Sequence, residues 1–276
     1  MDTSRTRQTA SPGTHSLAWA VLAASVLEVI APVVTINGPG SSPGNGSGPE
    51  LLITPVGWAF SIWGVIYTLA ITHAVAVLVR GAGDVPRRLQ VDQIALYLGG
   101  TLWIVLVGLD SSLATAAALL LMLIAAVDGV LTVARAPMRP GWFAVLTRAA
   151  IGLYAGWVTA AFFLNISTAL VEFGAVEADQ LPWQVGVLIV AAVALLIVSI
   201  AARGIPTYAA AGVWALLGIA VTGASNGTTG VVWIAAISAV VLVVTVVALR
   251  LKGQHPATPS HGEAAETTRA QRDSHD

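Results

Sequence analysis

The sequence predicts an all-α membrane protein, a polytopic bundle of about eight transmembrane helices. Its 276 residues are 56% hydrophobic and only 10% charged, and its mean hydropathy is +0.82. These values are too apolar for a soluble domain of this length. The apolar residues also fall into runs of roughly 20 residues, the length that crosses a bilayer as a helix. The lipid bilayer is therefore the first partner that we expect.

The apolar runs are separated by polar, Gly-rich or Pro-rich connections. In chain order they are residues 17–36, 57–79, 91–109, 112–134, 143–171, 183–202, 206–223 and 229–250. The first run follows a short basic head, but it is longer than the core of a signal peptide and contains Glu28, so we interpret it as a membrane span. The third and fourth runs are separated only by Asp110, Ser111 and Ser112, which predicts a tight antiparallel pair of helices.

The basic residues indicate how the helices are oriented. With eight spans, all 13 Lys and Arg residues fall on one side of the membrane, whereas seven or nine spans would scatter them over both sides. They are Arg5, Arg7, Arg80, Arg87, Arg88, Arg135, Arg139, Arg148, Arg203, Arg250, Lys252, Arg269 and Arg272. The positive-inside rule then predicts a multi-pass protein of the cell membrane with both termini in the cytoplasm.

The second run opens with an unusual density of aromatic residues: Trp58, Phe60, Trp63 and Tyr67. The last three are spaced three and four apart, so they share one face of a helix. An interfacial belt would explain Trp58, but Tyr67 lies about 14 Å deeper along the helix. We therefore interpret this face as an aromatic wall that lines the interior of the bundle, with an interfacial belt as the alternative.

The fifth run carries a second stripe at helical spacing, made of Tyr154, Trp157, Ala161 and Asn165. Such a stripe is either a binding face or a packing face. Trp103 in the third run lies about as far from the outer membrane surface as Trp63 and Asn165 do, roughly 9 Å by helical rise. These residues are therefore expected at one level of the bundle.

Several ionisable residues lie inside the predicted spans. Glu28 is in the middle of the first span, where an ionised carboxylate costs about 3 kcal/mol, so it should face protein or water. Its role stays open between a polar anchor for a ligand, a proton-coupling group and an interhelical hydrogen bond. Asp128 and Arg148 are expected to form a structural ion pair, and a proton relay that also includes His73 is the alternative.

These motifs resemble the TspO/translocator protein family, also called tryptophan-rich sensory proteins, whose members have five membrane helices. In the second span the resemblance rests on a proline followed by aromatics and Trp-x-x-x-Tyr, here Pro55, Trp58, Phe60, Trp63 and Tyr67. In the fifth span it rests on Tyr-x-x-Trp and an Asn eight residues later, here Tyr154, Trp157 and Asn165. It covers residues 17–172. One departure is that Trp103 follows Thr101 and Leu102, where the family usually has an Asn next to the Trp.

The resemblance implies a cavity in the bundle, capped by the first loop, that binds planar apolar molecules such as porphyrins, other tetrapyrroles, haem or sterols. The roles that it implies are sensing and transport. It places around the cavity the candidate ligand-binding residues Glu28, Trp58, Phe60, Trp63, Tyr67, Trp103, Tyr154, Trp157 and Asn165. Aromatic faces also suit planar ligands on chemical grounds alone, because they stack, while one amide or acid fixes orientation.

The domain organisation that we expect has four parts. Residues 1–16 form a cytoplasmic head, 17–172 a TspO-like five-helix bundle, 173–252 an additional three-helix membrane module and 253–276 a disordered cytoplasmic tail. The additional module should pack against the first five helices without lining the cavity, because its Trp183, Trp214 and Trp233 lie near span ends or follow no stripe. A chain that ends near Gly174 should then keep some ligand binding.

Other functions are excluded or retained as alternatives. The chain has no cysteine and shows no nucleophile–base pair and no metal-ligand spacing, so we expect neither an enzyme nor a resident metal or cofactor. A formal net charge of -1 does not favour nucleic acid as a partner. The alternatives are a proton-coupled transporter of a small solute, with Glu28 or Asp128 as the coupling group, and a structural membrane subunit. A homodimer is a possible further association.

Overall fold

The computed structural model describes residues 12–35, 49–81, 85–109, 111–139 and 141–253, and these residues contain eight α-helices, one 3-10 helix and no strand. The elements are α1 (Pro12–Thr35), η1 (Gly57–Ser61), α2 (Ile62–Arg80), α3 (Arg87–Val107), α4 (Ser112–Arg135), α5 (Gly141–Glu172), α6 (Leu181–Ala201), α7 (Pro206–Ser225) and α8 (Thr229–Gly253). All eight α-helices are long and apolar enough to cross a membrane. The predicted fold class, a multi-pass helical membrane protein, is confirmed.

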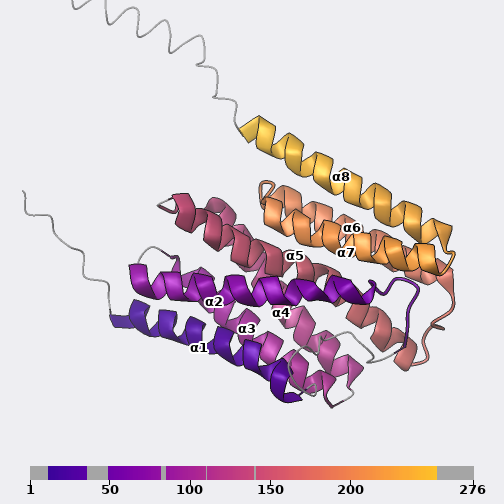
Figure 1. Ribbon diagram of the computed structural model, residues 1–276, viewed down its shortest axis with the longest axis horizontal. Coiled ribbons are helices and arrows are strands. Elements are labelled where there is room, and N and C mark those ends of the chain that lie inside the picture. Colours follow the sequence, from indigo (N-terminus) through magenta and orange to yellow (C-terminus); the bar gives the residue numbers. More distant parts are fainter. Residues whose placement is uncertain (1–11, 36–48, 82–84, 110, 140, 254–276) are drawn as a thin grey trace, which may run out of the picture.

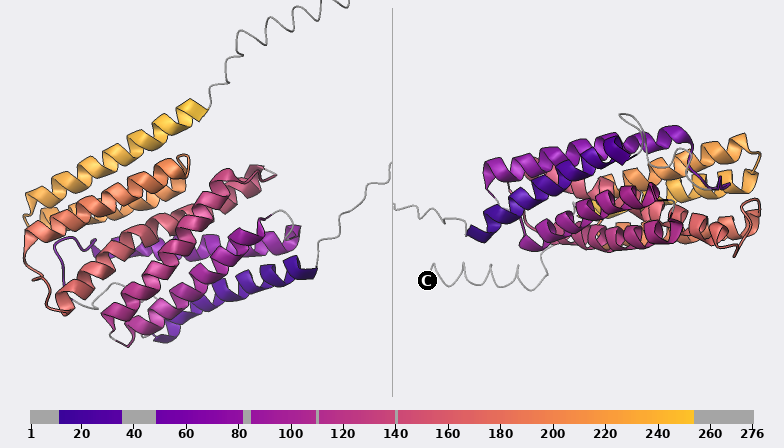
Figure 2. Two further views of the ribbon diagram at one scale, coloured as in Figure 1. Left: turned by 180° about the vertical axis from the view of Figure 1, so that it is seen from behind. Right: turned by 90° about the horizontal axis from the view of Figure 1, so that it is seen from below.

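The helices lie side by side along the longest axis of the molecule, with α1 at one edge and α8 at the other (Figure 1). The view from behind in Figure 2 shows the same order. The first residue of α1 and the last residue of α8 lie at the same end of the bundle, as an even number of spans requires. Of the contacts between neighbouring helices, those of α3 with α4 are among the most extensive, as the short connection between them predicts.

The two ends of the bundle differ in charge. The described basic residues all lie within about two turns of a helix terminus at one end, which we call the basic end: Arg80, Arg87, Arg88, Arg135, Arg139, Arg148, Arg203, Arg250 and Lys252. We call the opposite end the mouth end. It contains η1, the C-terminal ends of α3, α5 and α7, and the N-terminal ends of α4, α6 and α8 (Figure 1).

The boundaries differ from the predicted ones mainly at two places. Trp58 and Phe60 lie in the 3-10 turn η1 and not in the first turns of α2, so they are offset from the stripe that an unbroken α-helix would form. At the basic end α1 begins at Pro12, five residues before the predicted span 17–36, and α3 begins at Arg87, four residues before the predicted span 91–109. Asp110, which we predicted to lie between α3 and α4, is outside the described residues.

The α7 helix packs on α5 through two glycines, Gly152 and Gly156. A Cβ atom added to Gly156 would collide with the backbone carbonyl of Tyr208, and one added to Gly152 would lie 3.2 Å from the Tyr208 nitrogen. The spacing is the Gly-x-x-x-Gly pattern that allows membrane helices to approach closely. Thr159 Oγ1 and the Tyr208 hydroxyl are 3.0 Å apart and hydrogen-bonded across the same interface. The group of C-terminal helices α6 to α8 therefore packs directly on the first five helices, because α7 is in close backbone contact with α5.

The ion pair of Asp128 is not the predicted one. Asp128 accepts hydrogen bonds from both Nε and Nη2 of Arg88, with an Nε–Oδ2 distance of 2.6 Å, so the expected pairing with Arg148 is wrong. The Arg88 side chain is 70% exposed, and such a pair contributes little to stability. The count of helix turns places Asp128 and Arg148 at one depth, but it does not show which face of α4 carries Asp128. Both α3 and α5 pack against α4, and Asp128 lies on the side of α3.

Candidate functional site

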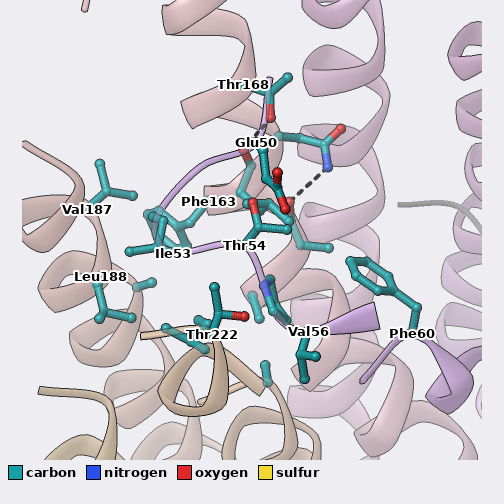
Figure 3. A pocket seen from close by; sticks show the side chains of 18 of the residues that line it. Glu50, Ile53, Thr54, Val56, Phe60, Phe163, Thr168, Val187, Leu188 and Thr222 are labelled. Carbon is teal, nitrogen blue, oxygen red and sulfur yellow. Dashed lines mark hydrogen bonds between the residues drawn. The ribbon is translucent and has the colours of Figure 1, made fainter. Parts of the chain in front are cut away.

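A cavity of about 620 Å³ extends into the bundle from the mouth end. Its wall is formed by η1 and the segment before it, by the first turn of α2, by α3, the beginning of α4 and α5, and by α6 and α7. Figure 3 shows Phe60, Val187, Leu188 and Thr222 around it. The volume is within the range of about 300–1,000 Å³ that is typical of small-molecule sites.

The deep part of the cavity is aromatic, with Trp63 at its centre. The Trp63 ring is stacked on Trp103, with centroids 6.0 Å apart, and it makes edge-to-face contacts with Tyr154 and Trp157 at 5.7 and 6.3 Å. Phe60 in turn contacts Trp157 edge-to-face at 5.7 Å. The side chains of Phe60, Trp63, Trp103 and Trp157 are all buried. The interpretation of an aromatic wall inside the bundle is therefore confirmed for Phe60 and Trp63, and Trp103 and Trp157 extend this wall.

Asn165 fixes the position of one of these rings. Its Oδ1 accepts a hydrogen bond of 3.2 Å from Trp103 Nε1, and its Nδ2 donates to the carbonyl of Ala161 one turn earlier on α5. The equal depth that the sequence predicts for Trp103 and Asn165 is thus realised as a direct contact. The residues before Trp103 are Thr101 and Leu102, where the family usually has an Asn. In this chain the amide that binds the Trp103 ring comes from Asn165 on α5.

A buried acid lies behind the aromatic wall. Glu28 is 1% exposed and its Oε1 accepts a hydrogen bond from the Tyr154 hydroxyl, while its Oε2 has no partner among the described residues. A Cβ added to Gly100 would collide with this carboxyl group, so the glycine makes room for the acid. Buried polar atoms without a partner are uncommon in folded proteins. Glu28 is therefore a buried acid behind the cavity wall, hydrogen-bonded to Tyr154, whose ring contacts the lining residue Trp63.

The nine predicted ligand-binding residues occupy three different places. Those that line the cavity are Phe60, Trp63, Trp103, Trp157 and Asn165. Those that are absent from the cavity lining and belong to the buried layer behind Trp63 are Glu28, Tyr67 and Tyr154. Trp58 is 45% exposed and packs edge-to-face on Trp214 at 4.8 Å, so it lies outside the cavity, where the 3-10 turn has directed it.

Sequence reasoning missed the wall opposite the aromatic residues. It comes from α6 and α7, with Val187, Leu188, Ala191, Leu195, Ala215, Leu216, Ile219, Thr222, Ser225 and Asn226. The prediction that the C-terminal helices do not line the cavity is therefore wrong, and a chain that ends near Gly174 would lack one side of it. Aromatic residues mark only one side of the site. The opposite wall consists mainly of small and aliphatic side chains, which also occur on helix faces in contact with lipid. The Gly-x-x-x-Gly pattern of Gly152 and Gly156 was the available sequence signal that another helix approaches α5 closely.

The segment before η1 closes over the cavity and is held by the C-terminal helices. Leu51 and Ile53 are buried against α6, α7 and α8. The amide of Leu52 donates to Gln184 Oε1 at 2.8 Å, and the amide of Val56 donates to the Gly218 carbonyl at 3.2 Å. The resemblance implied that the first loop caps the cavity. The described part, residues 49–56, is a cover, and residues 36–48 lie outside the described ranges.

We expect Gln184→Leu to release this cover. Gln184 is fully buried, and besides Leu52 it binds the Ala178 carbonyl through Nε2 at 2.6 Å. Leucine keeps the volume but leaves the Leu52 amide and the Ala178 carbonyl unpaired, at about 1–3 kcal/mol for each buried group. Hydrogen exchange of a peptide covering residues 49–56 should therefore accelerate. The matched control is Gln180→Leu, whose side chain is exposed; equal exchange in both variants would contradict the anchoring role of Gln184.

The third ionisable residue singled out by sequence, His73, is far from the cavity lining. It is buried in α2, where its Nδ1 is 3.0 Å from Gln93 Nε2 and its ring stacks on Phe143. Gln93 also donates to the Tyr97 hydroxyl at 3.3 Å. Among the described residues no group of three His, Cys, Asp or Glu side chains could hold a metal ion.

Comparison with known proteins gives one match. A family model described as "TSPO-like protein" matches residues 15–248. No curated protein matches the chain significantly. No solved structure does so either. The family match continues through α6, α7 and most of α8, which the resemblance over residues 17–172 had left out.

Proposed function

Because this chain belongs to the TSPO-like protein family, we propose that it binds a planar apolar molecule in its cavity, either to sense it or to transport it. Porphyrins, other tetrapyrroles, haem and sterol-like molecules are the candidate ligands. The observation that carries the proposal is the 620 Å³ cavity with Phe60, Trp63, Trp103 and Trp157 in its wall. Ring faces of this kind stack on flat ligands, and a mostly apolar concave site buries most of a ligand's surface.

Different parts of the cavity wall have different roles in the proposed binding. The aromatic rings contact the flat body of the ligand, and the mainly small and aliphatic residues of α6 and α7 form the opposite wall. Asn165 holds Trp103 in place and also lines the cavity. The segment 49–56 covers the bound molecule. We propose no catalytic role, because the side chains that line the described cavity include no nucleophile beside a base.

The proposal is tested by titrating the purified protein with protoporphyrin IX, haem and cholesterol while tryptophan fluorescence is followed. Since three of the cavity rings are tryptophans, a bound porphyrin should quench them strongly and saturably, with one ligand per chain. For the non-absorbing sterol, a saturable shift of the emission is expected. The proposal fails if none of these ligands gives a saturable change.

Proton-coupled transport of a small solute is the second candidate function, and Glu28 is the observation that favours it. This acid is buried within a predicted span and has an oxygen without a partner among the described residues, as expected for a group that binds and releases protons. A binding pocket should tolerate Glu28→Gln, because glutamine retains the shape and accepts the Tyr154 hydrogen bond. A proton-coupled transporter should lose pH-driven uptake in vesicles, because glutamine does not titrate. Unchanged uptake in the Glu28→Gln variant would exclude coupling through this residue.

We also propose that the protein lies in the cell membrane with its basic end in the cytoplasm, so that both termini are cytoplasmic. The positive-inside rule supports this orientation, since every described Lys and Arg is at that end. Reporter fusions at Gly44 and Gly253 should then report opposite sides of the membrane. The same side for both positions would contradict the eight-span topology.

A further inference from the structure

We propose that the cavity selects planar ligands that are uncharged or cationic and discriminates against ligands that carry carboxylates. The inference rests on the proposed function and narrows its ligand class. It follows from the charges of the side chains that line the cavity and from the position of the bundle's basic residues.

The charged side chains of the cavity wall are both acidic. Glu50 lies in the covering segment and Glu172 is the last residue of α5, and both are exposed at the mouth end. Figure 3 shows Glu50 and Thr168 in the cavity wall, and Thr168 precedes Glu172 by one turn of α5. In the described part of the chain, no Lys, Arg or His lines the cavity.

Residues 36–48, which lie outside the described ranges, add no charged residue to the connection that leads to η1. The sequence contains no Lys or Arg between Arg7 and Arg80, so the whole connection before η1 is free of basic residues. It contains none between Arg148 and Arg203 either, which includes the connection from α5 to α6. All basic residues of the described chain are at the opposite end of the bundle.

The deep end of the cavity offers a carboxylate no ionic partner. Trp157 and Glu172 both line it from α5, and they lie about 22 Å apart along the helix. The lining rings that contact Trp157, those of Phe60 and Trp63, carry no charge. A carboxylate placed there would be removed from water without a counter-ion, which is strongly unfavourable.

A dicarboxylate such as protoporphyrin IX is therefore disfavoured, relative to an uncharged analogue, in both orientations. With its acid groups inward they are desolvated and unpaired, and with its acid groups outward they meet Glu50 and Glu172. The carboxylates of the ligand and of the two glutamates repel one another, and water and salt reduce this repulsion without abolishing it. An ester, a hydroxyl or an amine at the same position avoids the repulsion, and an amine is attracted. Ligands of neutral or cationic character are thus favoured.

The test uses protoporphyrin IX and its uncharged dimethyl ester, together with cholesteryl hemisuccinate and cholesterol as a second pair. Dissociation constants are measured by tryptophan fluorescence on the full chain in a non-ionic detergent. The quantity that decides is the ratio of the constants for the acid and the neutral member of each pair. Because acids and esters partition differently into micelles, this ratio is compared between proteins and not taken alone.

In the parent the acid should bind more weakly than its neutral analogue. In the double variant Glu50→Gln/Glu172→Gln, the ratio of the acid's dissociation constant to that of the neutral analogue should fall by about tenfold at low ionic strength. The matched control is Glu177→Gln, an exposed acid in the connection from α5 to α6 that does not line the cavity; its ratio should equal that of the parent. Added salt should reduce the ratio in the parent, because exposed charges are screened.

Two results would overturn the inference. If the double variant keeps the parent's ratio, or if the parent binds the acid more tightly than the ester, the cavity does not select by charge, and the proposed binding function stands. If the parent binds no member of either pair, the proposed function fails and the inference fails with it.

Discussion

Replacing Gly156 by leucine should separate α7 from α5 and destabilise the protein by about 3 kcal/mol or more. The Cβ of any side chain at this position would collide with the Tyr208 carbonyl and lie 2.9 Å from the Ala211 Cβ. A backbone carbonyl cannot move away by changing a rotamer, so the two helices must shift. In thermal unfolding followed by circular dichroism, the midpoint should fall by roughly 10 °C.

The same variant should also lose affinity for planar ligands, because α7 contributes a wall of the cavity. The matched control is Gly186→Leu on α6, where an added Cβ has no atom within 4 Å. The control should unfold within a few degrees of the parent and bind ligand normally. A Gly156→Leu protein that is as stable as Gly186→Leu would contradict the close approach of α5 and α7.

The second large effect is expected for Trp63→Ala. Trp63 is 5% exposed and contacts four other rings, those of Tyr67, Trp103, Tyr154 and Trp157. Removing a buried Trp side chain costs about 3–5 kcal/mol of folding stability. Removing a central aromatic contact should in addition weaken binding of a planar ligand by about 1–3 kcal/mol.

Two further variants separate the binding effect from the loss of stability. Trp63→Phe retains a ring and should recover most of the stability and part of the affinity. Trp183→Ala removes a tryptophan whose Nε1 donates to the Glu177 carbonyl at 2.9 Å, outside the cavity lining, and should leave the affinity unchanged. Ligand titrations at a temperature where all variants are folded provide the measurement. Should Trp63→Ala bind each planar ligand as tightly as the parent does, the aromatic cluster is packing and not a binding wall.

The sequence by itself determined the number of helices, their alternation and much of the aromatic wall. Each of these depends on local patterns: the length of an apolar run, the position of basic residues between runs, and the spacing of rings along one helix. The depths of Trp103 and Asn165 could be counted from the ends of their own helices. That count was sufficient to place them at one level, and the structure shows them hydrogen-bonded.

The lateral order of the helices was decided only by the tertiary structure. The predicted helices are apolar on most of their surface, since lipid and protein interior select the same residues, so sequence patterns do not show which helix lies beside which. For this reason the predicted cavity wall lacks α6 and α7. The predicted partner of Asp128 was wrong for a related reason: α3 and α5 both pack against α4, and the sequence does not show that Asp128 faces Arg88 of α3 and not Arg148 of α5. The anchoring of segment 49–56 by Gln184 depends on the same order, because it joins residues 132 positions apart. Close backbone contact at Gly156 brings α7 to α5, and that contact creates the second wall of the site.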